Sequence, residues 1–112
     1  MGPNILRAAD VAFISNARLA QISDPKKYVP FAPDLVVEVI SPGNTASAIQ
    51  LKVSQYLKAG VLLVWMMYSD RKQIVVYDSE GYVKTLSEDD TLDGGDVLPG
   101  LKIKVAELFP TE

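Results

Sequence analysis

Three side chains of this sequence have the types needed for hydrolytic chemistry: Asp10, Glu38 and Lys52. Glu38 interrupts the apolar run PDLVVEVISP (33–42), and Asp10 stands among apolar residues in ADVAFIS (9–15). If both runs are strands, the two carboxylates can meet at one end of a sheet and hold a hard divalent ion through oxygen. Magnesium suits such a site because it keeps water ligands and accepts oxygens of a substrate phosphate.

A metal ion held in this way lowers the pKa of a bound water and stabilises the charge that develops on a phosphate under attack. A neighbouring lysine can orient that water or stabilise the same charge. An aspartate, a glutamate and a lysine that converge at a sheet edge therefore predict the hydrolysis of phosphodiester bonds.

The composition narrows the chemistry further. The 112 residues contain no cysteine and no histidine, which excludes zinc clusters, thiol nucleophiles and Ser-His-Asp triads. The formal net charge is -3 and the sequence pI is about 4.9, so the chain lacks the broad positive surface of strong nonspecific nucleic-acid binders. A local basic strip remains compatible with these values.

The length and hydropathy predict one globular domain over residues 1–112, with 48% apolar and 22% charged residues. No apolar run is long enough for a transmembrane helix, so we expect no membrane partner. The N-terminus lacks the order of a signal peptide, and a cytoplasmic location is expected.

The elements that must position these side chains follow from hydrophobic periodicity. Residues 9–15 alternate on a period of two and predict a strand, and residues 34–40 predict a more strongly apolar one. The stretch between them, residues 16–32, predicts a long connection. Helical spacing then appears from Thr45 to Lys58, with Asn44 or Thr45 as N-cap.

The near-continuous apolar run at residues 61–68 predicts a buried strand, which completes a βαβ unit with a parallel pairing. Residues 72–86 predict a hairpin with its turn at 78–81. Residues 87–100 read as an acidic, glycine-rich loop, and residues 101–109 as a short strand that leads into a helical turn. The expected fold class is therefore α/β with a mixed sheet.

Two interpretations of Glu38 remain open at this stage. Glu38 shares a strand face with Val36 and Ile40, so it either lies at a partly solvated rim or is neutralised by a cation. Lys52 falls on the flank of the apolar helical stripe, where its stem could follow the core and its ammonium could reach the sheet. Lys52 could equally extend into water.

Four segments in this order resemble the bacterial "putative restriction endonuclease" family, a former domain of unknown function in the PD-(D/E)XK nuclease superfamily. They are ADVAFIS, PDLVVEVISP, KVSQYLKAGVLLVW and LDGGDVLPGLKIKVAELF. The resemblance implies a restriction-endonuclease-like core with a βαβ crossover and a C-terminal hairpin, and an activity on DNA that depends on Mg²⁺ or Mn²⁺.

The resemblance also implies roles for the three residues. Asp10 and Glu38 would be the metal ligands and, with Lys52, the catalytic residues. The superfamily usually has its lysine two residues after the glutamate, where this chain has Ile40. In this family the lysine comes from the following helix, and Lys52 matches in the run K-x-x-x-Y-x-x-x-G-V. An alternative function is a shortened, catalytically silent relative that acts as an assembly or binding module.

Comparison with the length of the family predicts a homodimer or larger assembly. Members of the family usually have an N-terminal helix and strands that would precede residue 1, and these would cover the strand predicted at residues 9–15. A second copy can cover the same edge or apolar face instead. We therefore expect sedimentation equilibrium to give the mass of a dimer or larger assembly. A monomer mass at all concentrations would contradict this expectation.

Overall fold

A computed structural model of the protein describes residues 10–14 and 32–109. Its strands are β1 (Val11–Phe13), β2 (Leu35–Ile40), β3 (Leu63–Tyr68), β4 (Gln73–Asp78), β5 (Val83–Leu86), β6 (Thr91–Asp93) and β7 (Lys102–Lys104). Its helices are α3 (Ala46–Lys58) and the 3-10 helix η1 (Val105–Leu108). The connection expected over residues 16–32 lies almost wholly outside the described residues.

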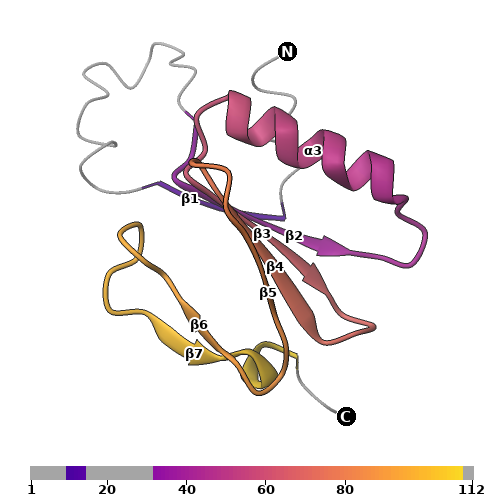
Figure 1. Cartoon of the computed structure of the whole chain (residues 1–112), viewed down its shortest axis with the longest axis vertical. Coiled ribbons are helices and arrows are strands. Elements are labelled where there is room, and N and C mark those ends of the chain that lie inside the picture. The colour runs from indigo at the N-terminus through magenta and orange to yellow at the C-terminus, as the bar shows by residue number, and fades with distance from the viewer. Residues whose placement is uncertain (1–9, 15–31, 110–112) are drawn as a thin grey trace.

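Five strands form a mixed sheet in the order β1-β2-β3-β4-β5 (Figure 1). β2 and β3 are parallel and joined through α3, which confirms the βαβ unit and the α/β class. The pairs β1-β2, β3-β4 and β4-β5 are antiparallel, and the last of these is the expected hairpin. Among the described residues, β1 lies at an edge of the sheet.

The sheet is covered on both faces, which explains why its central strands are apolar almost throughout. Figure 1 shows α3 on one side of the sheet and the two-stranded unit of β6 and β7 on the other. The core under α3 includes Val36, Ile49, Val53, Tyr56, Val64, Met66 and Tyr77. The core on the opposite face includes Leu35, Trp65, Ile74, Leu86, Leu92, Val105 and Phe109.

The ends of α3 follow local sequence signals. Thr45 is the N-cap, and its Oγ1 accepts a hydrogen bond from the Ala48 N–H at 3.2 Å. Gly60 follows the last turn with φ of 106°, a backbone conformation that favours glycine. Among the described residues, no helix is long and apolar enough to span a membrane.

The segment expected as an acidic loop contains a strand. β6 pairs with β7, and Leu92 at its centre is 1% exposed because it packs against the face of the sheet opposite α3. A three-residue strand with one apolar side chain has almost no detectable periodicity. Its existence depends on pairing with residues 102–104, which sequence periodicity does not report.

The turn after β6 generates a test of this packing. A Cβ added to Gly94 would lie 2.4 Å from the carbonyl oxygen of Leu98 and 2.6 Å from its Cβ. We expect Gly94→Ala to lower the free energy of unfolding by about 1–3 kcal/mol in urea titrations. Gly43→Ala is the matched control, since a Cβ at Gly43 meets nothing within 4 Å. Equal stability of the two variants would contradict the close approach at Gly94.

Candidate functional site

Glu38 is buried on the face of β2 that packs under α3. The alternation of the strand places it beside Val36, and the parallel register places it next to Met66 of β3. It is 3% exposed, so the interpretation of a solvated rim is wrong. A carboxylate in such surroundings needs a charged or hydrogen-bonding partner.

Lys52 supplies the charge. Its Nζ lies 3.0 Å from Glu38 Oε1, which is one of the two positions that helical spacing left open for Lys52. The Lys52 side chain is 39% exposed. The ammonium therefore sits at the boundary between the buried carboxylate and solvent, where a ligand could also reach it.

Tyr56 supplies a second donor. The helical pattern in the sequence assigned Tyr56 to the apolar stripe and did not indicate a role for its hydroxyl. Its hydroxyl donates to Glu38 Oε2, and the residue is fully buried. Burial, the hydrogen bond to Glu38 and the negative charges of Glu38 and Asp10 raise the pKa of Tyr56 well above its ordinary value. The phenol therefore stays protonated and donates. The i,i+4 spacing of Lys52 and Tyr56 could have indicated this second donor, because it puts both side chains on one face of the helix.

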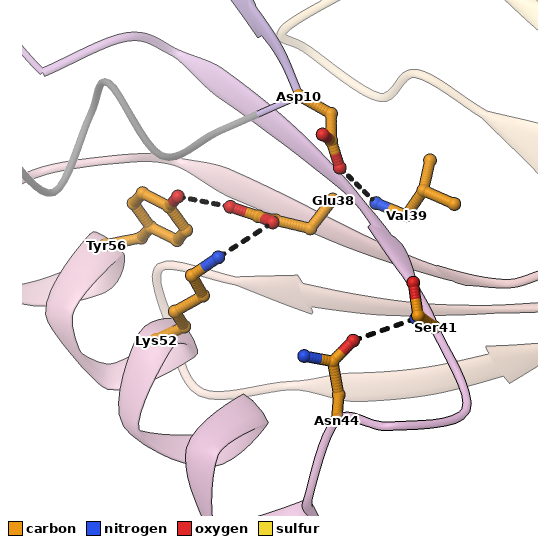
Figure 2. A network of polar contacts seen from close by, with 7 residues as sticks. All are labelled: Asp10, Glu38, Val39, Ser41, Asn44, Lys52 and Tyr56. Atoms are coloured by element: carbon orange, nitrogen blue, oxygen red, sulfur yellow. Dashed lines mark hydrogen bonds and ion pairs between the residues drawn. The ribbon is translucent and has the colours of Figure 1, made fainter.

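Asp10 precedes β1 beside the same region. The antiparallel register pairs Val11 with Val37, and one further step places Asp10 opposite Glu38. Residues opposite each other in an antiparallel pair share a face. Figure 2 shows that the Asp10 carboxylate turns toward the backbone of β2, where Oδ2 accepts a hydrogen bond from the Val39 N–H at 2.7 Å. Asp10 thus caps the end of the β1-β2 ladder.

Asp10, Glu38 and Lys52 all line one cleft of about 410 Å³, which also borders Leu51 and Gln55 of α3. We call this cavity the acidic cleft. The structure therefore brings the three predicted residues to one place. It joins Glu38 and Lys52 by a direct contact, and it bonds Asp10 to a backbone amide.

The turn from β2 to α3 holds this arrangement in place. Asn44 Oδ1 accepts a hydrogen bond from the Ser41 N–H at 2.8 Å (Figure 2), and the Asn44 N–H donates back to the Ser41 carbonyl at 3.0 Å. Thr45 then starts the helix. The short, doubly bonded turn limits how far α3 can shift relative to β2, and so it keeps Lys52 within reach of Glu38.

The donor set fits a hard divalent ion. Within the described residues there is no group of three or more acidic, histidine or cysteine side chains that could hold a metal. Two carboxylates are present, and magnesium commonly takes one or two together with waters and substrate phosphate. The Val39 bond uses Oδ2 of Asp10, and a carboxylate has further lone pairs on its second oxygen. The Glu38 oxygens each accept one bond here, although a carboxylate has about four lone-pair sites.

Comparison with known proteins gives one family and one fold. The model of the Uma2 family, described as "Putative restriction endonuclease", matches residues 2–106. A solved structure described as a putative nuclease belonging to DUF820, from Anabaena variabilis ATCC 29413, is similar with a TM-score of 0.63 and 21% identity. The alignment covers 70% of this chain and 45% of that one, so the chain spans less than half of that relative. No curated protein matches.

Removal of the Tyr56 hydroxyl tests the buried network. We expect Tyr56→Phe to lower the free energy of unfolding by about 1–3 kcal/mol, because Glu38 Oε2 loses its buried donor while the ring still fills the core. Tyr82→Phe is the control, since Tyr82 is 70% exposed, and its effect should stay within about 0.5 kcal/mol. Urea unfolding of both variants measures the difference. A neutral Tyr56→Phe would show that the Tyr56–Glu38 bond does not stabilise the fold.

Proposed function

Because the chain belongs to the Uma2 family, we propose that it hydrolyses phosphodiester bonds of DNA in a reaction that requires Mg²⁺. The family description and the nuclease-like fold support a nuclease. The observation that carries the proposal is the ion pair between buried Glu38 and partly exposed Lys52, in a cleft that Asp10 also lines. This combination of oxygen ligands and one cation suits an anionic phosphate substrate.

Asp10 and Glu38 would hold the metal ion, with Mn²⁺ as an alternative to Mg²⁺. Such an ion lowers the pKa of a bound water and offsets charge on the phosphate. Glu38 suits this role because the contacts with Lys52 and Tyr56 fix the direction of its carboxylate. Asp10 suits it because the bond to the Val39 amide fixes one of its oxygens.

Lys52 has two tasks in this proposal. Its charge lies 3.0 Å from Glu38 Oε1 and offsets the cost of holding that carboxylate in an apolar setting. An ammonium has three donors, and one of them engages Glu38 Oε1. The partly exposed position leaves the other donors able to reach a phosphate oxygen, where they stabilise negative charge as it develops.

The experiment combines cleavage with metal binding. We expect Asp10→Asn and Glu38→Gln to reduce Mg²⁺-dependent cleavage of duplex DNA by at least about 100-fold and to weaken Mn²⁺ binding in calorimetry. Lys52→Gln should reduce cleavage by about 100-fold or more, because it removes charge stabilisation at the phosphate. Lys58→Gln is the control, because Lys58 is an exposed lysine on the same helix that does not line the acidic cleft.

Two outcomes would contradict the proposal. If Glu38→Gln cleaves DNA as fast as the wild-type chain, Glu38 is not a catalytic residue. If the wild-type chain neither cleaves DNA nor binds Mg²⁺ or Mn²⁺ more tightly than Asp10→Asn, the chain is the silent relative that acts as an assembly or binding module.

A further inference from the structure

A second cavity continues from the acidic cleft across the ends of β2 and β3. It has a volume of about 290 Å³ and shares Ile40, Asn44 and Ile49 with the acidic cleft. On its far side lie Tyr68 and Arg71. Since Ile40 and Tyr68 are partners in the parallel register, the two cavities open along one edge of the sheet. We call this second cavity the arginine cleft.

Arg71 is placed to contact a ligand in this cavity. Its guanidinium carbon lies 5.2 Å from the centroid of the Tyr68 ring, a cation–π arrangement that restricts the side chain without occupying its N–H donors. Its backbone N–H donates to the Tyr68 carbonyl at 3.2 Å, so the main chain is also held. Arg71 itself remains exposed.

Two other described cations contact carboxylates. Lys52 Nζ bonds to Glu38 and keeps further donors, and Lys72 Nζ lies 3.8 Å from Glu88 Oε2. Of the basic residues that the structure describes, Arg71 alone lines the arginine cleft. Asp70 also lines this cavity, and its charge opposes an anion there.

We propose that the arginine cleft binds the DNA backbone next to the reacting phosphate, with Arg71 contacting a neighbouring phosphate of the same strand. The inference rests on the proposed function, because it assigns the substrate strand a path from Lys52 to Arg71. A guanidinium pairs with phosphate through two parallel N–H donors. The partly exposed side chain of Ile40, which lines both clefts, suits contact with a sugar.

A contact to phosphate does not depend on the DNA sequence, and this property distinguishes it experimentally from a contact to bases. A contact to a phosphate releases a counterion and adds about 0.9 to the slope of log affinity against log salt. Contacts to bases would instead depend on sequence. If Arg71 contacts a phosphate, removal of its charge should lower the affinity for unrelated duplexes equally and make the dependence of affinity on salt shallower.

The test measures DNA affinity by fluorescence anisotropy on two short duplexes of unrelated sequence, with Ca²⁺ replacing Mg²⁺ to suppress cleavage. We expect Arg71→Gln to weaken binding of both by about tenfold at low salt and to reduce the salt slope by about one. Arg71→Lys should keep the slope, because the charge remains. Asp70→Asn should tighten binding, because it removes a like charge. Lys58→Gln, outside both clefts, is the matched control and should behave as the wild-type chain.

Three results would overturn the inference. The first is an Arg71→Gln variant with the affinity and slope of Lys58→Gln. The second is a loss confined to one of the two duplexes, which would indicate contact with bases. The third is an Asp70→Asn variant as weak as Arg71→Gln, which would make both residues structural. If Mg²⁺-dependent cleavage by the wild-type chain persists in any of these cases, the proposed function stands. A wild-type chain that neither binds nor cleaves DNA refutes both proposals.

Discussion

A buried carboxylate is the constraint on which the described structure depends. Glu38 lies inside the core under α3, where an unpaired charge would cost several kcal/mol. The fold therefore has to bring a cation and a donor to the same point, and Lys52 and Tyr56 meet this need from one face of α3. The position and rotation of the helix relative to β2 are thus coupled to the polar contacts of one side chain.

The rest of the scaffold makes that position rigid. The central strands are buried on both faces, by α3 on one side and by the β6-β7 unit on the other. The polar groups collect where β2 and β3 end, which is where ligands usually bind in open α/β sheets. An apolar interior with a polar edge keeps the carboxylates fixed while leaving the acidic cleft open.

The net negative charge of the chain affects how such a site could attract an anionic substrate. With a net charge of -3, the protein as a whole would repel DNA at long range, so the proposed binding of DNA requires attraction by local cations. The described cavities concentrate those cations at one sheet edge, with Lys52 in the acidic cleft and Arg71 in the arginine cleft. Without histidine, the side chains available for acid and base chemistry are carboxylates, lysines and tyrosines.

The sequence by itself predicted the βαβ unit and limited the N-cap of α3 to Asn44 or Thr45, because both depend on periodicity or on residues close in the chain. It left open whether Glu38 lies at a solvated rim or is neutralised by a cation. Helical spacing allowed the Lys52 contact but equally allowed Lys52 to extend into water. Only the tertiary structure decided that Tyr56 is the second donor, that Asp10 caps the ladder at Val39 and that β6 exists. Those contacts arise from strand register and burial between distant segments. The type of a residue in the sequence does not reveal whether a distant segment supplies such a partner.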